Sequence, residues 1–111
     1  GAVHRLEFLG ERILYDARSP QTPGEYDYCL ANAGDEVVLG PGAALPAAVA
    51  EPTGRIAREG GLELGGIEYL VAGDGIPVFI DFNPVSSLHP RAGEVLGEDP
   101  MVVTARWLVG G

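Results

Sequence analysis

Lysine is absent from this 111-residue sequence, so its seven basic residues are all arginine, against sixteen aspartates and glutamates. The formal net charge is −9 at neutral pH. Nucleic acids and anionic membrane surfaces are themselves negatively charged, so they are poor partners for this chain unless a cation intervenes. We therefore expect neither a nucleic acid nor a membrane as a partner.

Cysteine and long apolar runs are also scarce. Cys29 is the only cysteine, which excludes an internal disulfide and a cysteine metal cluster. No stretch approaches the run of about 20 apolar residues that a membrane-spanning helix needs, and no signal peptide precedes the first predicted strand. We therefore expect a reducing, cytoplasmic location. The length predicts a single domain, residues 1–111, large enough for a core but small for a complete nucleotide-dependent enzyme.

The most informative stretch of the chain is residues 65–83, which predicts two strands around a turn. Glu68 lies on the first strand, and Asp81 and Asn83 lie on one face of the second, because side chains alternate along a strand. A loop of two or four residues places Glu68 on that same face, directly or diagonally opposite Asp81, within roughly 4.5–8 Å. A three-residue loop would place Glu68 on the other face.

Two carboxylates and one amide oxygen on one face would form a cluster of hard oxygen donors. Such donors suit one or two Mg²⁺ ions that are shared with substrate phosphates. The alternative is an ordinary hairpin with a polar outer face. We favour the metal site, because three donors of this kind on one face must either share a site or be solvated.

The residues around this cluster resemble a known family. Gly-Gly-Ile-Glu-Tyr-Leu-Val, a turn, and then Pro-Val-Phe-Ile-Asp-Phe-Asn-Pro are similar to the closing hairpin of the ATP-grasp ligases. In that family an acidic residue on the first strand and an acid-x-Asn on the second hold magnesium on the phosphates of ATP. The resemblance implies ATP and Mg²⁺ as cofactors, with Mn²⁺ as an alternative ion, and Glu68, Asp81 and Asn83 as the metal ligands.

The same resemblance suggests a reason for the absence of lysine. The family places lysines on the ATP phosphates from an earlier part of the fold. We therefore expect this chain to be the C-terminal part of a longer enzyme, with the missing N-terminal part as its partner, and the isolated chain to be inactive. The sequence leaves open whether the protein forms a homo-oligomer.

Residues 3–18 predict a further hairpin around a two-residue type II′ turn at Gly10-Glu11. In that register Leu6, Phe8, Ile13 and Tyr15 share an apolar face. The opposite face carries both signs of charge, with Arg5 opposite Asp16: Arg5, Glu7, Leu14, Asp16 and Arg18.

Arg5 and Arg18 on this second face are open to two interpretations. A solvated strand face would account for either arginine alone. The resemblance implies more: Arg18 would be a catalytic residue that steadies the transferring phosphoryl group or the tetrahedral intermediate, and Arg5 and Arg18 would both contact ATP. A guanidinium suits this task because its fork binds phosphate oxygens and keeps its charge.

Irregular structure and two helices account for most of the remaining chain. Residues 19–42 are irregular, with short strands predicted at 26–30 and 36–39 and Asn32 interpreted as a turn residue. Residues 43–60 predict a helix that Pro52 should kink or interrupt. Asp99-Pro100 should begin a further helix that ends at Gly110, with Trp107 as a core anchor.

A loop follows Asn83 and contains two serines. Ser86 is a candidate contact for a phosphate or the substrate, and local turn bonding explains it equally well. His89 precedes a proline, which favours an extended backbone, and a lone histidine on such a loop is not expected to be catalytic.

The predicted fold class is α+β: an antiparallel sheet built from two hairpins and covered by helices, mainly on one face. The resemblance identifies it as the C-terminal lobe of an ATP-grasp fold. It implies a ligase that forms an acyl phosphate from a carboxylate and ATP and transfers the acyl group to an amine, similar to the glutamate-tail ligases. A non-catalytic binding or assembly module and the lobe of an ATP-grasp kinase remain alternatives.

Overall fold

A computed structural model describes residues 2–20, 37–71, 73–84, 88–89 and 91–110 of the chain. The predicted strand at 26–30 and the sequence interpretations of Cys29, Asn32 and Ser86 lie outside these residues.

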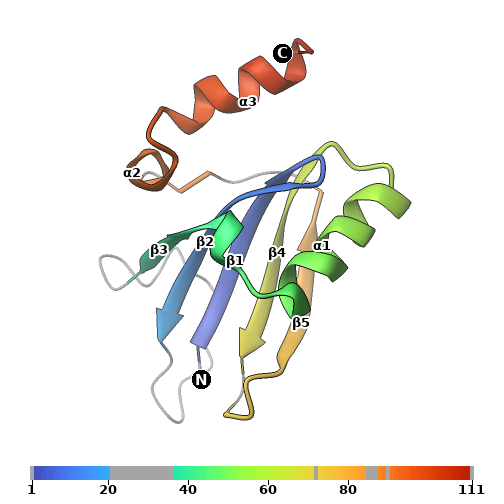
Figure 1. The fold of residues 1–111 in the computed structure, drawn as a ribbon, viewed down its shortest axis with the longest axis vertical. Helices are drawn as coiled ribbons and strands as arrows, with labels where there is room; N and C mark the ends of the chain where they lie inside the picture. The colour runs from blue at the N-terminus through green and yellow to red at the C-terminus, as the bar shows by residue number, and fades with distance from the viewer. Residues whose placement is uncertain (1, 21–36, 72, 85–87, 90, 111) are drawn as a thin grey trace.

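In the part of the chain that the structure describes, five antiparallel strands form one sheet in the order β3-β2-β1-β4-β5 (Figure 1). The strands are β1 (Ala2–Leu9), β2 (Arg12–Pro20), β3 (Val38–Pro41), β4 (Leu64–Val71) and β5 (Pro77–Asn83). β1 and β2 form one hairpin and β4 and β5 the other, and the two are joined by pairing of β1 with β4. The predicted α+β sheet built from two hairpins is therefore confirmed.

The β1–β2 hairpin turns at the predicted residues but contains a bulge that the sequence did not indicate. Gly10 has φ +55, as the first central position of a type II′ turn requires. Glu7 is paired with Tyr15, whereas Phe8 is paired with Ile13, so Leu14 is an extra residue in β2. Leu14 and Tyr15 consequently both enter the same core cluster, although they are neighbours in the sequence.

This bulge changes the register of the rest of the hairpin. The prediction that Arg5 lies opposite Asp16 was wrong, because Arg5 is paired with Ala17. Tyr15, predicted to share the face of Leu6 and Phe8, instead lies on the face of Arg5 and Glu7.

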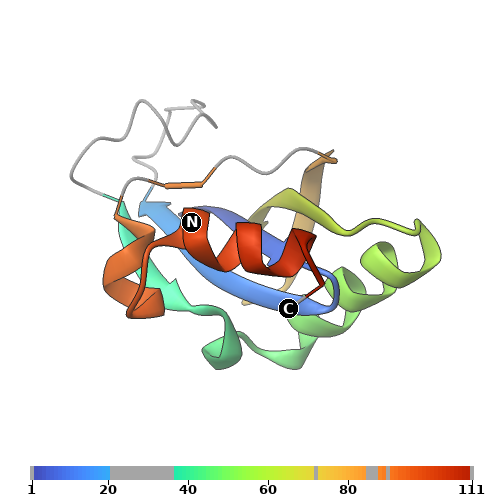
Figure 2. The ribbon, with the colours of Figure 1, turned by 90° about the horizontal axis from the view of Figure 1, so that it is seen from above.

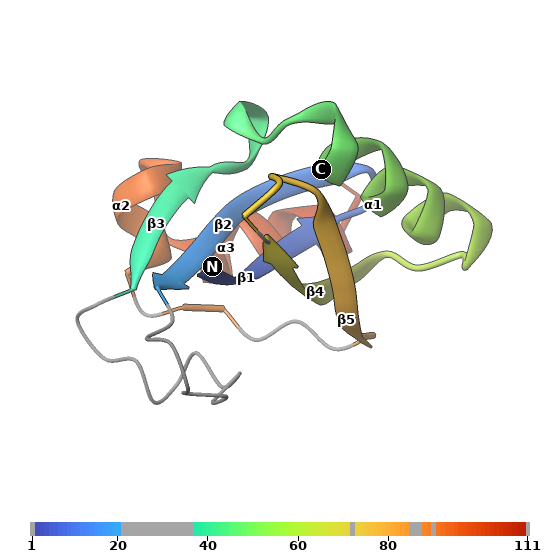
Figure 3. The same ribbon diagram turned by 90° about the horizontal axis from the view of Figure 1, so that it is seen from below.

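Both faces of the sheet carry a hydrophobic core, so the expected cover on mainly one face was wrong. Helix α1 (Ala47–Glu59), preceded by the 3₁₀ turn η3 (Gly42–Ala44), covers the first face. The core on this face joins strand side chains to those of α1: Leu6, Phe8, Ile67, Tyr69, Val49 and Ala57. Figure 3 shows α1 and η3 on one side of the sheet and residues 88–89 on the other.

Helices α2 (Ala92–Leu96) and α3 (Pro100–Leu108) lie at the end of the sheet where the β1–β2 turn is (Figures 1 and 2). They contribute Ala92 and Val103 to the second core, which they share with β1, β2 and the residue before β3: Leu9, Leu14, Tyr15, Ala17 and Val37. Removing these apolar side chains from water stabilises the fold by roughly 25 cal/mol per Å² of apolar surface buried.

The two predicted helices differ from expectation in detail. α1 runs through Pro52 without interruption and begins after Pro46, later than predicted. α3 begins as expected, with Asp99 as the N-cap whose carboxylate accepts from the backbone N–H of Met101 at 2.9 Å. Trp107 is 41% exposed, and Val103 rather than Trp107 anchors α3 in the core.

Gly42 provides a test of how tightly η3 packs on β2. A Cβ at Gly42 would overlap the backbone carbonyl of Ile13, whereas a Cβ at Gly40 would have no heavy atom within 4 Å. We expect Gly42→Ala to lower the free energy of unfolding by about 1–3 kcal/mol, the usual cost of overpacking. Urea denaturation midpoints would measure this. Gly40→Ala is the matched control, and an equal loss in both variants would contradict the steric explanation.

Candidate functional site

The β4–β5 hairpin places Glu68 directly opposite Asp81, as Cα partners on neighbouring strands. Asn83 is paired with Gly66 and lies on the same face. The predicted juxtaposition of the three residues is thus present, although the hairpin reaches it by another route. The connection between Val71 and Pro77 matches neither predicted loop length.

A bulge in β5 produces this pairing. The pairs run regularly from Val71 with Pro77 to Tyr69 with Phe79. A regular continuation would pair Glu68 with Ile80. The register instead shifts between Glu68 and Tyr69, so that Ile80 is an extra residue and Glu68 is paired with Asp81. Asp81 is exposed, and its Oδ1 accepts from the backbone N–H of Phe82 at 2.8 Å.

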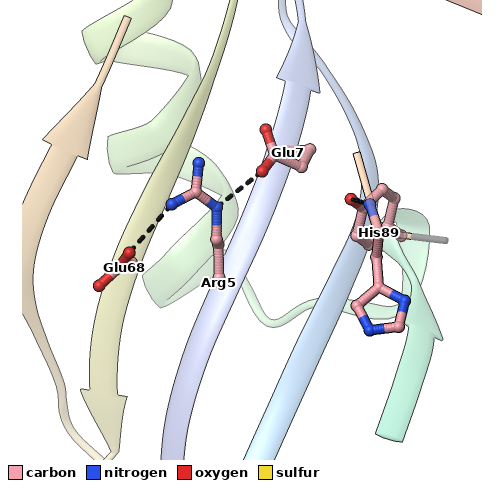
Figure 4. Close-up of polar contacts among 5 residues, drawn as sticks. Arg5, Glu7, Glu68 and His89 are labelled. Atoms are coloured by element: carbon pink, nitrogen blue, oxygen red, sulfur yellow. Dashed lines mark hydrogen bonds and ion pairs between the residues drawn. The ribbon is translucent and has the colours of Figure 1, made fainter. Parts of the chain in front are cut away.

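Arg5 joins this pair from the other side, because β1 places it directly opposite Glu68 on β4. Its Nη1 donates to Oε1 of Glu68 at 2.9 Å, and its Nε donates to Oε1 of Glu7 at 2.7 Å (Figure 4). Burial by itself would lower the pKa of Arg5, but the hydrogen bonds and charges of Glu7 and Glu68 together raise it. The guanidinium is therefore held as a cation between two carboxylates.

Glu7 is a buried acid that we did not single out from the sequence. Its side chain is 0% exposed, compared with 16% for Arg5 and 21% for Glu68. The sequence did contain one indication of its role: Glu7 lies two residues after Arg5, so both side chains lie on one face of β1. A buried carboxylate requires a partner, and Arg5 provides it.

Gly66 provides the room for this arrangement. It is paired with Glu7 across β1 and β4. A Cβ at Gly66 would come within 2.6 Å of Nη2 of Arg5 and 3.0 Å of Oε1 of Glu7. The ion pair therefore occupies the space that a side chain on β4 would take.

One nitrogen of this group has no protein acceptor. Nη2 of Arg5 is buried and makes no hydrogen bond with the described residues. A buried cationic N–H without an acceptor is costly, so this atom is suited to receive an oxygen from outside the described structure.

The carboxylates that the structure describes do not by themselves form a complete metal site. Within the described ranges, no group of three or more His, Cys, Asp and Glu side chains is placed to hold a metal ion. Glu68 and Asp81 supply two carboxylates, and Asn83 is the neighbouring amide. A hard cation here would need further oxygens, from water or from a ligand.

Arg18 does not lie where we predicted. It is paired with His4, on the face that carries Leu6 and α1, and therefore on the face opposite Asp81. The cause is the extra residue Leu14, which reverses the alternation along the second half of β2. Arg5, our weaker candidate, is the arginine that lies beside Glu68.

Next to Arg18 is a polar network that the sequence did not reveal. Nδ1 of His4 lies 2.7 Å from Oδ2 of Asp16, and the hydroxyl of Tyr69 donates to Oδ1 of Asp16 at 2.7 Å. The rings of His4 and Tyr69 stack with centroids 4.6 Å apart. Burial, and then Asp16, raise the pKa of Tyr69. This network connects β1, β2 and β4 on the face that α1 covers.

His89 forms hydrogen bonds that hold the chain after β5 in place. Its backbone N–H donates to the hydroxyl of Tyr15 at 2.6 Å, and its Nδ1 accepts from the backbone N–H of Arg91 at 3.1 Å. Burial, and then the charge of Arg91, lower the pKa of His89. These contacts attach the segment after β5 to β2.

Several solved structures share this fold. The macrocyclase MdnC, bound with the precursor peptide MdnA from Microcystis aeruginosa MRC, matches 99% of this chain with a TM-score of 0.67 and 20% sequence identity. The ATP-grasp ligase PsnB, complexed with a phosphomimetic variant of its minimal precursor, Mg and ADP, matches 98% with a TM-score of 0.66 and 16% identity. This chain has the fold of an ATP-grasp ligase.

The ATP-grasp fold is present here only in part. The chain spans 30% of the MdnC chain and 32% of the PsnB chain. No protein-family model matches the sequence, and no curated protein does either. Among the described residues, no helix is long and apolar enough to cross a membrane.

Tyr15 lies beside Glu7 and offers a test of the burial of this region. Burial is the main cause that raises the pKa of Tyr15 to about 12, and the charge of Glu7 adds to it. Because the folded-state pKa exceeds the unfolded value of 10.0, the stabilisation is complete below pH 10 and is lost as the pH rises to about 12. Lysine is absent and adds nothing in this range.

We therefore expect the free energy of unfolding to fall between about pH 9 and about pH 11, and Tyr15→Phe to reduce that fall. Urea unfolding at the two pH values would measure it for both proteins. The same decline in the wild type and in Tyr15→Phe would show that Tyr15 does not titrate as described.

Proposed function

We propose that this chain is the C-terminal lobe of an ATP-grasp ligase that activates a carboxylate with ATP and transfers it to an amine. In this proposal Glu68, Asp81 and Asn83 hold Mg²⁺, or Mn²⁺ in its place. The observation that carries the proposal is the pairing of Glu68 with Asp81, with Asn83 on the same face. The similarity in fold to PsnB, which was solved with Mg and ADP, supports it.

The donor set fits the ion. Carboxylate and amide oxygens are the ligands that Mg²⁺ prefers, and Mg²⁺ keeps positions for water or phosphate when a protein supplies only a few of them. Asp81 is exposed and therefore accessible to an ion from solvent. When bound, the ion would neutralise charge on the ATP phosphates and orient them.

Arg5 takes the role for which Arg18 was first considered. It lies beside Glu68, keeps its positive charge and has a buried Nη2 that finds no acceptor among the residues that the structure describes. An oxygen of a phosphate or of an acyl phosphate would satisfy that atom and gain a charge-assisted hydrogen bond. Ser86 remains a predicted contact of the same phosphates.

The substrate is proposed from the structures that share this fold. MdnC was solved with a precursor peptide, and PsnB with a minimal precursor. We therefore propose a peptide as the molecule that bears the carboxylate, and we assign the phosphate-binding lysines and most of the substrate pocket to the part of the ligase outside this chain.

A non-catalytic module with the same fold is the second candidate function. The observation that favours it is the complete absence of lysine from the chain, although the acid cluster is intact. A kinase lobe would use the same metal residues and differ in the group that accepts the phosphate.

The metal site is tested by thermal unfolding with increasing Mg²⁺ or Mn²⁺. An ion that binds only the folded chain at about ten times its dissociation constant adds about 1.4 kcal/mol, which raises the midpoint by several degrees. We expect Asp81→Asn to remove most of this shift. Glu94→Gln, an exposed acid on α2, should not. An equal response in all three proteins would indicate diffuse binding of counter-ions to a chain of charge −9.

The isolated chain should not turn over ATP, because it carries the proposed metal ligands without any lysine for the phosphates. A coupled assay for ADP release would measure this, with Asp81→Ala as the control. Release well above background that Asp81→Ala abolishes would overturn the expectation.

A further inference from the structure

We propose that the buried Glu7 is a positioning residue for the metal site: it holds the Arg5 guanidinium and balances its charge, so that Glu68 remains available to a divalent cation. This inference rests on the proposed function, since it assigns a role to Glu7 toward the same ion.

The geometry shows how one guanidinium is shared between two carboxylates. Arg5 uses Nε for Glu7 at 2.7 Å and Nη1 for Glu68 at 2.9 Å, so the two contacts do not compete for one nitrogen. The Glu7 side chain is fully buried, whereas Glu68 is 21% exposed. Electrostatic attraction is stronger where water is excluded, so Glu7 is the main counter-charge of Arg5.

Burial also holds the side chain of Glu7 in place more firmly than that of Glu68. It is enclosed between Tyr15 on β2 and Gly66 on β4, its neighbours in the pairing register. The space left by the missing side chain of Gly66 is filled by Arg5 and Glu7 themselves. Arg5 therefore keeps its Nε contact if Glu68 turns toward an ion.

The local charge explains how Glu7 would affect the binding of a cation. Glu7, Glu68 and Asp81 with Arg5 carry a formal charge of −2, which matches a divalent ion. Without the charge of Glu7, Arg5 would have Glu68 as its counter-ion, and an incoming ion would have to displace a cation from its own ligand. Removing Arg5 as well would return the formal charge to −2.

The test is Mn²⁺ binding to the full 111-residue chain, measured from the electron paramagnetic resonance signal of free Mn²⁺. We expect Glu7→Gln to weaken binding about tenfold, within the range seen for coupled charged neighbours. The double variant Arg5→Gln/Glu7→Gln should restore the affinity to within about threefold of the wild type. A merely structural role of Glu7 would give no such rescue, because the second substitution removes more of the same contacts.

A measurement on the wild type alone keeps the inference testable if Glu7→Gln fails to fold. The Nε–H of Arg5, observed by nitrogen-15 NMR, should stay protected from exchange with solvent both without and with Mg²⁺. Loss of that protection on adding Mg²⁺ would overturn the inference, since Glu7 would then not hold Arg5 in the metal-bound state.

The outcomes separate this inference from the proposed function. If Asp81→Asn and Glu94→Gln both bind Mn²⁺ as the wild type does, the metal site itself fails. If Asp81→Asn loses binding but Glu7→Gln does not, or if the double variant binds no better than Glu7→Gln, only the role of Glu7 is overturned.

Discussion

The ion pairs of Arg5 with Glu7 and Glu68 are the interactions on which the arrangement of the candidate site depends. The pair with Glu68 connects β1 with β4, the two strands that join the hairpins into one sheet, whereas the pair with Glu7 lies within β1. They also resolve an electrostatic conflict, because a fully buried carboxylate and two further acids on one face would otherwise repel one another. Gly66 has no side chain, and the charged group occupies the space that one would fill. The packing of this group and its charge balance therefore depend on each other.

The two faces of the sheet differ in how their polar groups are paired. One carries the core under α1 and the network of His4, Asp16 and Tyr69, in which every polar group named has a partner. The other carries the acid pair, Arg5 and a second core formed with α2 and α3 near the β1–β2 turn. A buried, unsatisfied Nη2 occurs on this second face. This contrast is the reason that our proposal places the ligand on the face of Glu68 and not on the face that α1 covers.

Two bulges decide which charged groups meet. The extra residue Leu14 carries Arg18 to the α1 face and brings Tyr15 next to Glu7. The extra residue Ile80 brings Asp81 opposite Glu68. A single additional residue moves every subsequent side chain to the other face, because the side-chain period of a strand is two. The positions of the bulges therefore decide the candidate site together with the loop lengths.

The sequence by itself determined the α+β class, the two hairpins, the turn at Gly10 and the start of α3 at Asp99, because alternation, glycine at a positive φ and helix capping are local effects. It also predicted that the acids of the β4–β5 hairpin share a face, although the structure reaches this pairing through a bulge and another loop length, and the resemblance drawn from those residues agrees with the fold of MdnC and PsnB. Only the tertiary structure decided the faces of Arg18 and Tyr15, the second core and the burial of Glu7. The faces of Arg18 and Tyr15 follow from the extra residue in β2, and the two cores join residues far apart in the chain, which local sequence patterns do not specify.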